Sequence, residues 1–250
     1  MTAPAPVIRD FGGIPVEFRR KRVRCLRMTV HPDGAVRVSV PWHVSDDEAC
    51  GFVAARADWM RRRVDAIRRV PPPAETHFET GDTVRTFGET LPLRVAETET
   101  PSAPCIEEGA LVLPVRPGAT EAERRVVFAV WLRARLTETL SRLLAHWTAA
   151  MGEAPVRWDL RRMKSRWGSC AARKRFIRFN LQLAEQPVAC IEYVVVHELA
   201  HLSVQNHSPA FWAVVARHLP DWRARRRELN NPVPPGEAGN GKGFHPAFFS

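Results

Sequence analysis

The sequence predicts an α+β fold in which a β-rich N-terminal subdomain precedes a helical core. Residues 14 to 41 and 75 to 117 contain short segments in which apolar and polar side chains alternate, the pattern of half-buried strands. After Thr120, apolar residues instead recur at helical spacing over a long segment. Strands therefore dominate the first part of the chain and helices the second.

We divide the chain into four parts on this basis. Residues 1–73 are expected to form a β-hairpin plus helix subdomain, 74–119 a β segment, and 120–230 the helical domain. Residues 231–250 are rich in Gly and Pro, a composition typical of disordered tails. The sequence shows no internal repeat.

Strands are predicted where alternating segments are bounded by turn residues. His31-Pro32-Asp33-Gly34 is one such turn. The predicted strands cover residues 25–30, 35–40, 83–87, 91–95, 110–115, 156–160 and 175–179. The last two bracket Arg166-Trp167-Gly168-Ser169-Cys170, and a strand beside a catalytic helix can hold an extended peptide by edge pairing.

Helices are predicted from capping signals and from apolar spacing. Ser45 opens a helix that runs through about Arg69, and Thr120 opens another that runs to about Ala150, each with a Glu completing a capping box. On the first of these helices, Trp59 is expected in the core or at a docking surface. Further helices are predicted around residues 191–201, after Ser208-Pro209, and at 222–229.

One short motif carries the chemistry. His197-Glu198-Leu199-Ala200-His201 places two imidazoles one helical turn apart, so both can bind a single tetrahedral ion. Glu198 lies about 100° around the helix, where its carboxylate can reach a water activated by the metal. His207 follows in a predicted loop between two helices, free to bend back toward the pair. Three His ligands with one open position are typical of catalytic zinc.

Other roles for these residues remain open. The three histidines could be surface or core residues without a metal. The third ligand could also come from a Glu on a later helix, for which Glu228 is the candidate, although its Arg-rich surroundings favour a salt bridge. The loop before His207 contains no Gly, so it is expected to turn through Gln205 and Asn206, because Asn tolerates the left-handed conformation.

Composition sets outer limits on the class of protein. The chain has 250 residues, of which 45% are hydrophobic and 26% charged, ordinary values for a soluble globular protein. No apolar run approaches the roughly 18 to 20 residues that span a bilayer, and the N-terminus lacks the layout of a signal peptide. Five widely spaced cysteines argue for a reducing compartment, so we expect a cytoplasmic protein.

The formal net charge of +10 raises the question of a polyanionic partner. Basic residues are dense between 157 and 178, just before the candidate zinc helix. Of the 37 basic residues only Lys21, Lys164, Lys174 and Lys242 are lysines, and such an Arg bias can also reflect a GC-rich genome. Binding of nucleic acid or an acidic partner by residues 157–178 is therefore one of two explanations.

Four motifs occur together in the second half of the chain. They are Met163-Lys164-Ser165-Arg166-Trp167-Gly168-Ser169-Cys170, Asn180-Leu181, the segment from Tyr193 to Leu202, and Asn206-His207-Ser208-Pro209-Ala210-Phe211-Trp212. In these motifs the chain resembles the YgjP-like metallopeptidase family, which is related to the SprT-like and WLM zinc peptidases, and the resemblance covers essentially the whole chain. It implies a zincin-like catalytic domain at 120–230 in which His197, His201 and His207 bind Zn²⁺ and Glu198 is the catalytic acid/base. SprT-like relatives are associated with proteolysis at DNA.

The predicted function is a zinc-dependent metallopeptidase, a hydrolase of polypeptides. Glu198 would act as general base toward a zinc-activated water and then as general acid toward the leaving amine. The alternative is a nucleic-acid-associated module with a mainly structural zinc site, or a protease recruited to DNA. The physiological substrate and the oligomeric state are not predicted.

Several neighbours are candidates for supporting roles. Tyr193, Arg166 and His218 could stabilise the oxyanion, although the apolar setting of Tyr193 favours core packing. Asn206 is expected to brace the ligand loop through side-chain hydrogen bonds. For Trp167, with Cys170, packing beside the zinc helix is favoured over contact with substrate.

Overall fold

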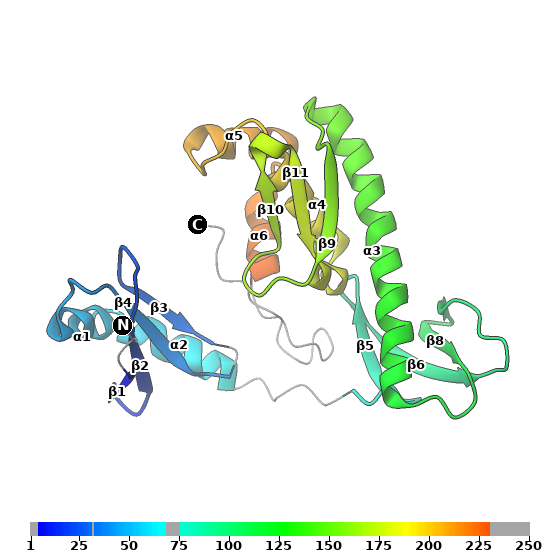
Figure 1. Cartoon of the computed structure of the whole chain (residues 1–250), viewed down its shortest axis with the longest axis horizontal. Helices are drawn as coiled ribbons and strands as arrows, with labels where there is room; N and C mark the ends of the chain where they lie inside the picture. Colours follow the sequence, from blue (N-terminus) through cyan, green and yellow to red (C-terminus); the bar gives the residue numbers. More distant parts are fainter. Residues whose placement is uncertain (1–4, 32, 69–75, 231–250) are drawn as a thin grey trace. The chain divides into compact units, whose positions relative to one another are not determined.

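The computed structural model describes residues 5–31, 33–68 and 76–230 (Figure 1). Within these ranges the chain forms three sheets and six α-helices, in agreement with the predicted α+β class. The chain divides into two compact units, Met1–Pro72 and Pro73–Ser250, and each is described by itself. The tail predicted to be disordered, 231–250, lies outside the described residues.

A four-stranded sheet and two helices make up the N-terminal unit. The strand order is β1-β2-β4-β3, in which β2 and β4 are parallel and both outer pairs are antiparallel. Val16 of β2 and alternate residues of β4 are buried and form one core with the helices. The elements are β1 (Val7–Asp10), β2 (Pro15–Arg20), β3 (Arg27–Val30), β4 (Val36–Val40), α1 (Asp46–Ala54) and α2 (Ala57–Arg68).

The helix predicted from Ser45 to about Arg69 is interrupted. The Ser45 capping box is confirmed, but α1 ends at Ala54 and α2 begins at Ala57. Between them the N–H of Arg56 donates to the carbonyl of Val53 at 2.9 Å, a tight turn that redirects the chain. Trp59 does not belong to the core of this unit, because it is 46% exposed while its neighbour Met60 is fully buried.

The second unit begins with another four-stranded sheet, which packs on the start of a long helix. The strand order is β5-β6-β8-β7, again with a central parallel pair. The helix starts at the predicted Thr120 capping box and ends at Gly152, which is left-handed with φ of 69°. The elements are β5 (Thr83–Thr86), β6 (Glu89–Glu97), β7 (Cys105–Glu107), β8 (Ala110–Val115) and α3 (Glu121–Met151).

The two four-stranded sheets share one topology. Each has an antiparallel, a parallel and an antiparallel pair in the same chain order, and each last strand is followed by a capping-box helix. The cap follows the strand end by the same number of residues, from Val40 to Ser45 and from Val115 to Thr120. The repetition lies in strand pairing, which the pattern of side chains does not reveal, so the sequence analysis missed it.

A third sheet and three helices complete the second unit. Its order is β10-β11-β9, with β9 and β11 parallel and β10 antiparallel at one edge, farthest from α3 in Figure 1. Strands β9 and β11 lie one residue from their predicted limits and α6 ends one residue later than predicted, whereas α4 begins three residues before its predicted start and β10 was not predicted. The elements are β9 (Arg157–Arg161), β10 (Gly168–Ala171), β11 (Phe176–Asn180), α4 (Val188–Ala200), α5 (Pro209–His218) and α6 (Trp222–Asn230).

Helix α4 is the centre of the second unit and is buried along nearly all of its length. One carboxylate, Glu192, ties it to two neighbouring helices: the indole Nε1 of Trp147 on α3 donates to it at 3.1 Å, and Arg225 on α6 forms an ion pair with it. Close packing also fixes its start, because a Cβ on Gly88, which has φ of +86°, would lie 2.7 Å from Cγ of Pro187. The side chains of α4 are therefore held in fixed positions.

Candidate metal centre

Three imidazoles converge at the end of α4. His197 and His201 lie one turn apart, and His207 approaches them from the loop that precedes α5, so that candidate ligand atoms of all three lie within 4.8 Å of one another. Nε2 of His197 and Nε2 of His207 are 3.1 Å apart. A tetrahedron with metal–nitrogen bonds of 2.0–2.1 Å has an edge of about 3.3 Å, so this spacing suits two ligands of one ion.

Neighbouring groups orient two of the rings. Nδ1 of His201 lies 3.0 Å from the carbonyl of Val204, which can only accept, so Nδ1 carries the proton and Nε2 is the atom able to bind a metal ion. Oη of Tyr193, one turn before His197, lies 3.5 Å from Nδ1 of that ring. Burial lowers the pKa of His197 well below its usual value, and the adjacent imidazoles add to this effect. Neutral imidazole is the form that binds metal.

The loop between α4 and α5 reaches His207 without any left-handed residue. Gln205 and Asn206 do not have positive φ, so the predicted left-handed turn is wrong. The chain instead unwinds through a right-handed turn, in which the N–H of Val204 donates to the carbonyl of Ala200 at 2.9 Å. Asn206 is exposed and makes no side-chain hydrogen bond within the described ranges.

A different group holds this loop. The hydroxyl of Ser203 donates to Glu153, just after α3, at 2.5 Å, and the same carboxylate pairs with Arg175 at 2.8 Å. Beyond the loop, His207 stacks on Trp212 of α5 with ring centroids 5.6 Å apart. Trp212 in turn stacks on Trp222 of α6 at 4.3 Å. Sequence reasoning did not find Glu153, since no local pattern links residue 153 to residue 203.

The side chain of Glu198, on α4, is buried against Gly168, the first residue of β10. A Cβ built on Gly168 would lie 2.4 Å from Oε1 of Glu198, so only glycine leaves room for this carboxyl group. Oε2 of Glu198 is buried and has no hydrogen-bond partner within the described residues. Burial raises the pKa of Glu198 to about 8, an effect that the positive charge of Arg166 opposes. Gly168 belongs to a motif of the family resemblance, but no local pattern in the sequence indicates its contact with Glu198.

The segment before β10 is clamped by Asn180 at the end of β11. Its buried side chain accepts from the N–H of Met163 at 3.2 Å and donates to the carbonyls of Met163 and Arg166 at 3.0 and 2.8 Å. Trp167, next in the chain, is 1% exposed and belongs to the core around α4. The packing predicted for Trp167 is therefore confirmed. The side chain of Arg166, just before it, is exposed.

Two candidates from the sequence analysis lie away from the three imidazoles. His218 ends α5, about 15 Å along the helix from Ser208, and its ring packs edge-on against Trp147 with centroids 6.0 Å apart. Glu228, considered as an alternative third ligand, lies beside the thiol of Cys190 and contributes to raising the pKa of that thiol to about 12, after the larger effect of burial. Neither belongs to the group of residues able to hold a metal among those described.

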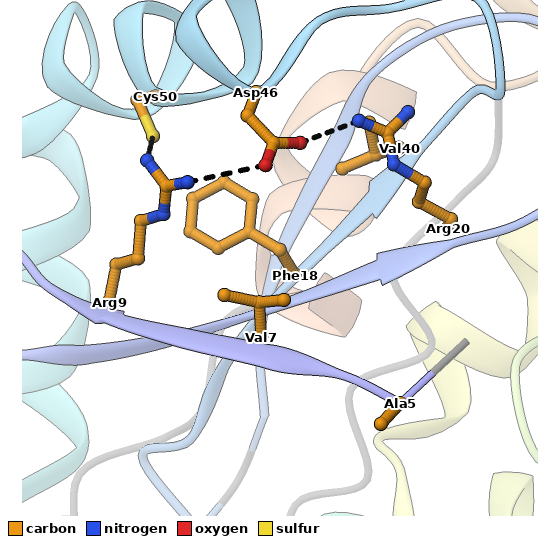
Figure 2. Close-up of a pocket in the computed structure, with 8 residues that line it drawn as sticks. All are labelled: Ala5, Val7, Arg9, Phe18, Arg20, Val40, Asp46 and Cys50. Atoms are coloured by element: carbon orange, nitrogen blue, oxygen red, sulfur yellow. Dashed lines mark hydrogen bonds and ion pairs between the residues drawn. The ribbon is translucent and has the colours of Figure 1, made fainter.

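The N-terminal unit contains a separate hollow of about 90 Å³ between the sheet and α1. Figure 2 shows Arg9 and Arg20 on either side of Asp46, above Phe18 and Val7. Asp46 pairs with both guanidinium groups, at 3.3 and 2.5 Å, which neutralises part of their charge. No member of the histidine group lines this hollow.

The second unit, with its three convergent imidazoles and a buried carboxylate on one helix, has the features of a metal-dependent peptidase. The family model described as YgjP-like, metallopeptidase domain, matches residues 24–232, and the chain belongs to this family. A solved structure, the metallopeptidase zymogen of Pyrococcus abyssi abylysin, is 27% identical, over 35% of this chain and 86% of that one, with a TM-score of 0.32. No curated protein matches the chain. None of the described helices is long and apolar enough to cross a membrane.

Proposed function

We propose that the chain is a zinc-dependent peptidase in which His197, His201 and His207 bind the ion and Glu198 is the general base and acid. The observation that carries this proposal is the convergence of the three imidazoles beside the buried carboxyl group of Glu198. Family membership supports a metallopeptidase, and the donor set favours zinc, because three imidazole nitrogens suit a borderline ion that keeps an open fourth position.

The residues present fit a bound cation. Oε2 of Glu198 is buried without a hydrogen-bond partner among the described residues, an arrangement that is costly unless a ligand or water completes it. The Nε2 atoms of His197 and His207 already stand near ligand spacing. When bound, zinc would supply Lewis acidity, which acidifies water and polarises the scissile carbonyl.

The chain's own groups would perform the proton transfers. Glu198 would take a proton from the attacking water and then deliver it to the departing amine. Gly168 has no side chain and so leaves room for the carboxyl group of Glu198. The positive charge of Arg166 favours the ionised form of that carboxyl group. The Tyr193 hydroxyl would hold the ring of His197 in orientation, and the Val204 carbonyl that of His201. Loss of such a supporting group typically lowers metal affinity 10- to 100-fold.

Strand β10 would bind the substrate. It is an edge strand, since β11 is its sole partner in the described sheet, and its first residue contacts Glu198. An extended peptide that pairs with the free edge of β10 would therefore pass next to the general base. Main-chain pairing of this kind holds a polypeptide without demanding particular side chains.

The test is metal content measured together with cleavage. Purified protein should contain one zinc per chain by mass spectrometry and should cleave casein in a chelator-sensitive manner. His207→Ala should lose both, whereas Glu198→Gln should keep the zinc and lose cleavage. His146→Ala, which removes an exposed histidine on α3, is the matched control and should behave as wild type. Equal cleavage by wild type and Glu198→Gln would refute the proposal.

A second candidate is a nucleic-acid-associated module with a mainly structural zinc site, or a peptidase recruited to DNA. It is favoured by exposed cations, among them Arg157, Arg162 and Lys164, which have no carboxylate ion pair within the described parts of the chain. Binding of DNA should then weaken steeply as salt rises, because each phosphate contact releases counterions. Absence of binding to DNA or RNA at low ionic strength would remove this candidate.

A further inference from the structure

Two pairs of exposed cations flank the candidate substrate strand. Lys164 and Arg166 precede β10 (Gly168–Ala171), and Arg173 and Lys174 follow it. No carboxylate forms an ion pair with any of these four side chains in the portion of the chain that the structure describes. The strand that lies against Glu198 thus has unneutralised positive charge at both ends.

Nearby carboxylates are already paired with other cations. Arg175 pairs with Glu153 at 2.8 Å. Arg178 forms a bidentate ion pair with Asp159, with its shorter contact at 2.7 Å. Arg161 lies 3.9 Å from the same Asp159. Within residues 157–178, Arg161, Arg175 and Arg178 thus have carboxylate partners, whereas Arg157, Arg162 and the four cations that flank β10 have no ion pair within the described residues.

Both flanking pairs stand on ordered backbone. The segment with Lys164 and Arg166 is fixed by the hydrogen bonds of the buried Asn180 side chain to Met163 and Arg166. The segment with Arg173 and Lys174 is a 3₁₀ turn, closed by the N–H of residue 175 on the carbonyl of residue 172 at 3.0 Å. A preorganised backbone lowers the entropy that charged side chains lose when they engage a ligand.

Resting on the proposed peptidase function, we propose that the site selects extended polypeptide segments that carry acidic residues on both sides of the bond to be cleaved. The four residues of β10 span about 13 Å, so the two cation pairs would meet side chains roughly four to six residues apart on a paired strand. The partner is an acidic peptide, because pairing along the edge of β10 requires a main chain with regularly spaced amide N–H and C=O groups, which the sugar-phosphate backbone of a nucleic acid lacks.

Cleavage of matched peptides tests this inference. The full-length zinc-loaded protein is given quenched fluorescent peptides of one length, with Glu at both flanks, Gln at both flanks, or Lys at both flanks. Each exposed charge contact typically changes an affinity by a few-fold. With contacts at both flanks, kcat/KM should therefore be about tenfold higher for the Glu peptide than for the Gln peptide, and lowest for the Lys peptide. The difference should shrink when NaCl is raised from 50 to 300 mM.

Substitutions should assign the effect to the four cations. Lys164→Gln with Arg166→Gln should remove the preference at one flank, and Arg173→Gln with Lys174→Gln the preference at the other. Arg133→Gln with Arg142→Gln, which removes two exposed charges from α3, is the matched control for net charge and should leave the preference intact. Loss of the preference in this control would overturn the inference.

The remaining outcomes separate this inference from the proposed function. If all three peptides are cleaved equally well, the inference is wrong and the peptidase stands. If none is cleaved, their binding to Glu198→Gln is measured by fluorescence anisotropy: tighter binding of the Glu peptide supports the charge selection, and equal affinities refute it. A single-stranded oligonucleotide that displaces the Glu peptide at 150 mM salt with higher affinity would assign the cations to nucleic acid instead.

Discussion

Replacing Gly168 by Ala would test the packing around Glu198, the proposed general base. A Cβ at this position would lie 2.4 Å from Oε1 of Glu198, 2.7 Å from Cγ and 2.8 Å from Cδ, where ordinary contacts begin near 3.4 Å. The φ of Gly168 lies outside the left-handed range, so the substitution adds steric overlap without backbone strain. The carboxyl group must therefore retreat by about 1 Å.

The magnitude follows from how tightly Glu198 is enclosed. It is 2% exposed, so it cannot swing into solvent, and overpacking of this kind typically costs about 1–3 kcal/mol. For a protein of this size each kcal/mol lowers Tm by roughly 2–4 °C. A displacement of about 1 Å at a catalytic group can cost on the order of 100-fold in rate. Gly168→Ala should thus lose most cleavage while zinc content stays the same, because no ligand is touched.

The assays are thermal unfolding, zinc content and casein cleavage, with a double-mutant cycle as the control. Glu198→Ala removes the Cγ, Cδ and Oε1 atoms that the added methyl group would overlap. The Tm lost on Gly168→Ala should therefore be much smaller in the Glu198→Ala background than in wild type. Equal losses in the two backgrounds, or full activity of Gly168→Ala, would refute the assigned contact.

Three other substitutions or probes have defined outcomes. Asn180→Ala should cost about 2–4 kcal/mol and raise amide hydrogen exchange in the segment before β10, because several buried hydrogen bonds are lost together; unchanged exchange would contradict the clamp. Tyr193→Phe should weaken zinc binding about tenfold in a competition titration, since the hydroxyl near Nδ1 of His197 is removed; an unchanged affinity would exclude that role. Cys190, whose pKa is raised to about 12 mainly by burial, should remain unmodified by iodoacetamide at pH 8 while the exposed Cys25 reacts, and comparable rates by mass spectrometry would contradict this burial.

Helix α4 and the loop that carries His207 are predictable from local sequence. The spacing of His197 and His201 fixes their common face once a helix is assumed, and Ser208-Pro209 marks the restart that leaves His207 in the loop. The capping boxes at Ser45 and Thr120 are equally local, and both are present. Signals of this kind lie within a few residues of the feature that they predict.

Features that depend on distant parts of the chain were missed for a physical reason. Strand β10 has the sequence Gly-Ser-Cys-Ala, which lacks branched and aromatic residues, so its extended form depends on pairing with β11. The contact of Gly168 with Glu198 and the contact of Glu153 with Ser203 join residues that are far apart in the chain. The break between α1 and α2 likewise has no Gly or Pro at the bend.

The shared strand order has a consequence for folding. In each of the three sheets the parallel pair is joined through one intervening strand, which closes a loop of only about 20 residues. Contacts between residues so close in the chain form quickly and do not wait for the rest of the molecule. Each sheet can therefore open and close as a separate cooperative unit, and hydrogen exchange should resolve three groups of amides with distinct opening free energies. The candidate metal ligands lie outside all three sheets, so the candidate site would become complete only after the third sheet, through β10, has packed against α4.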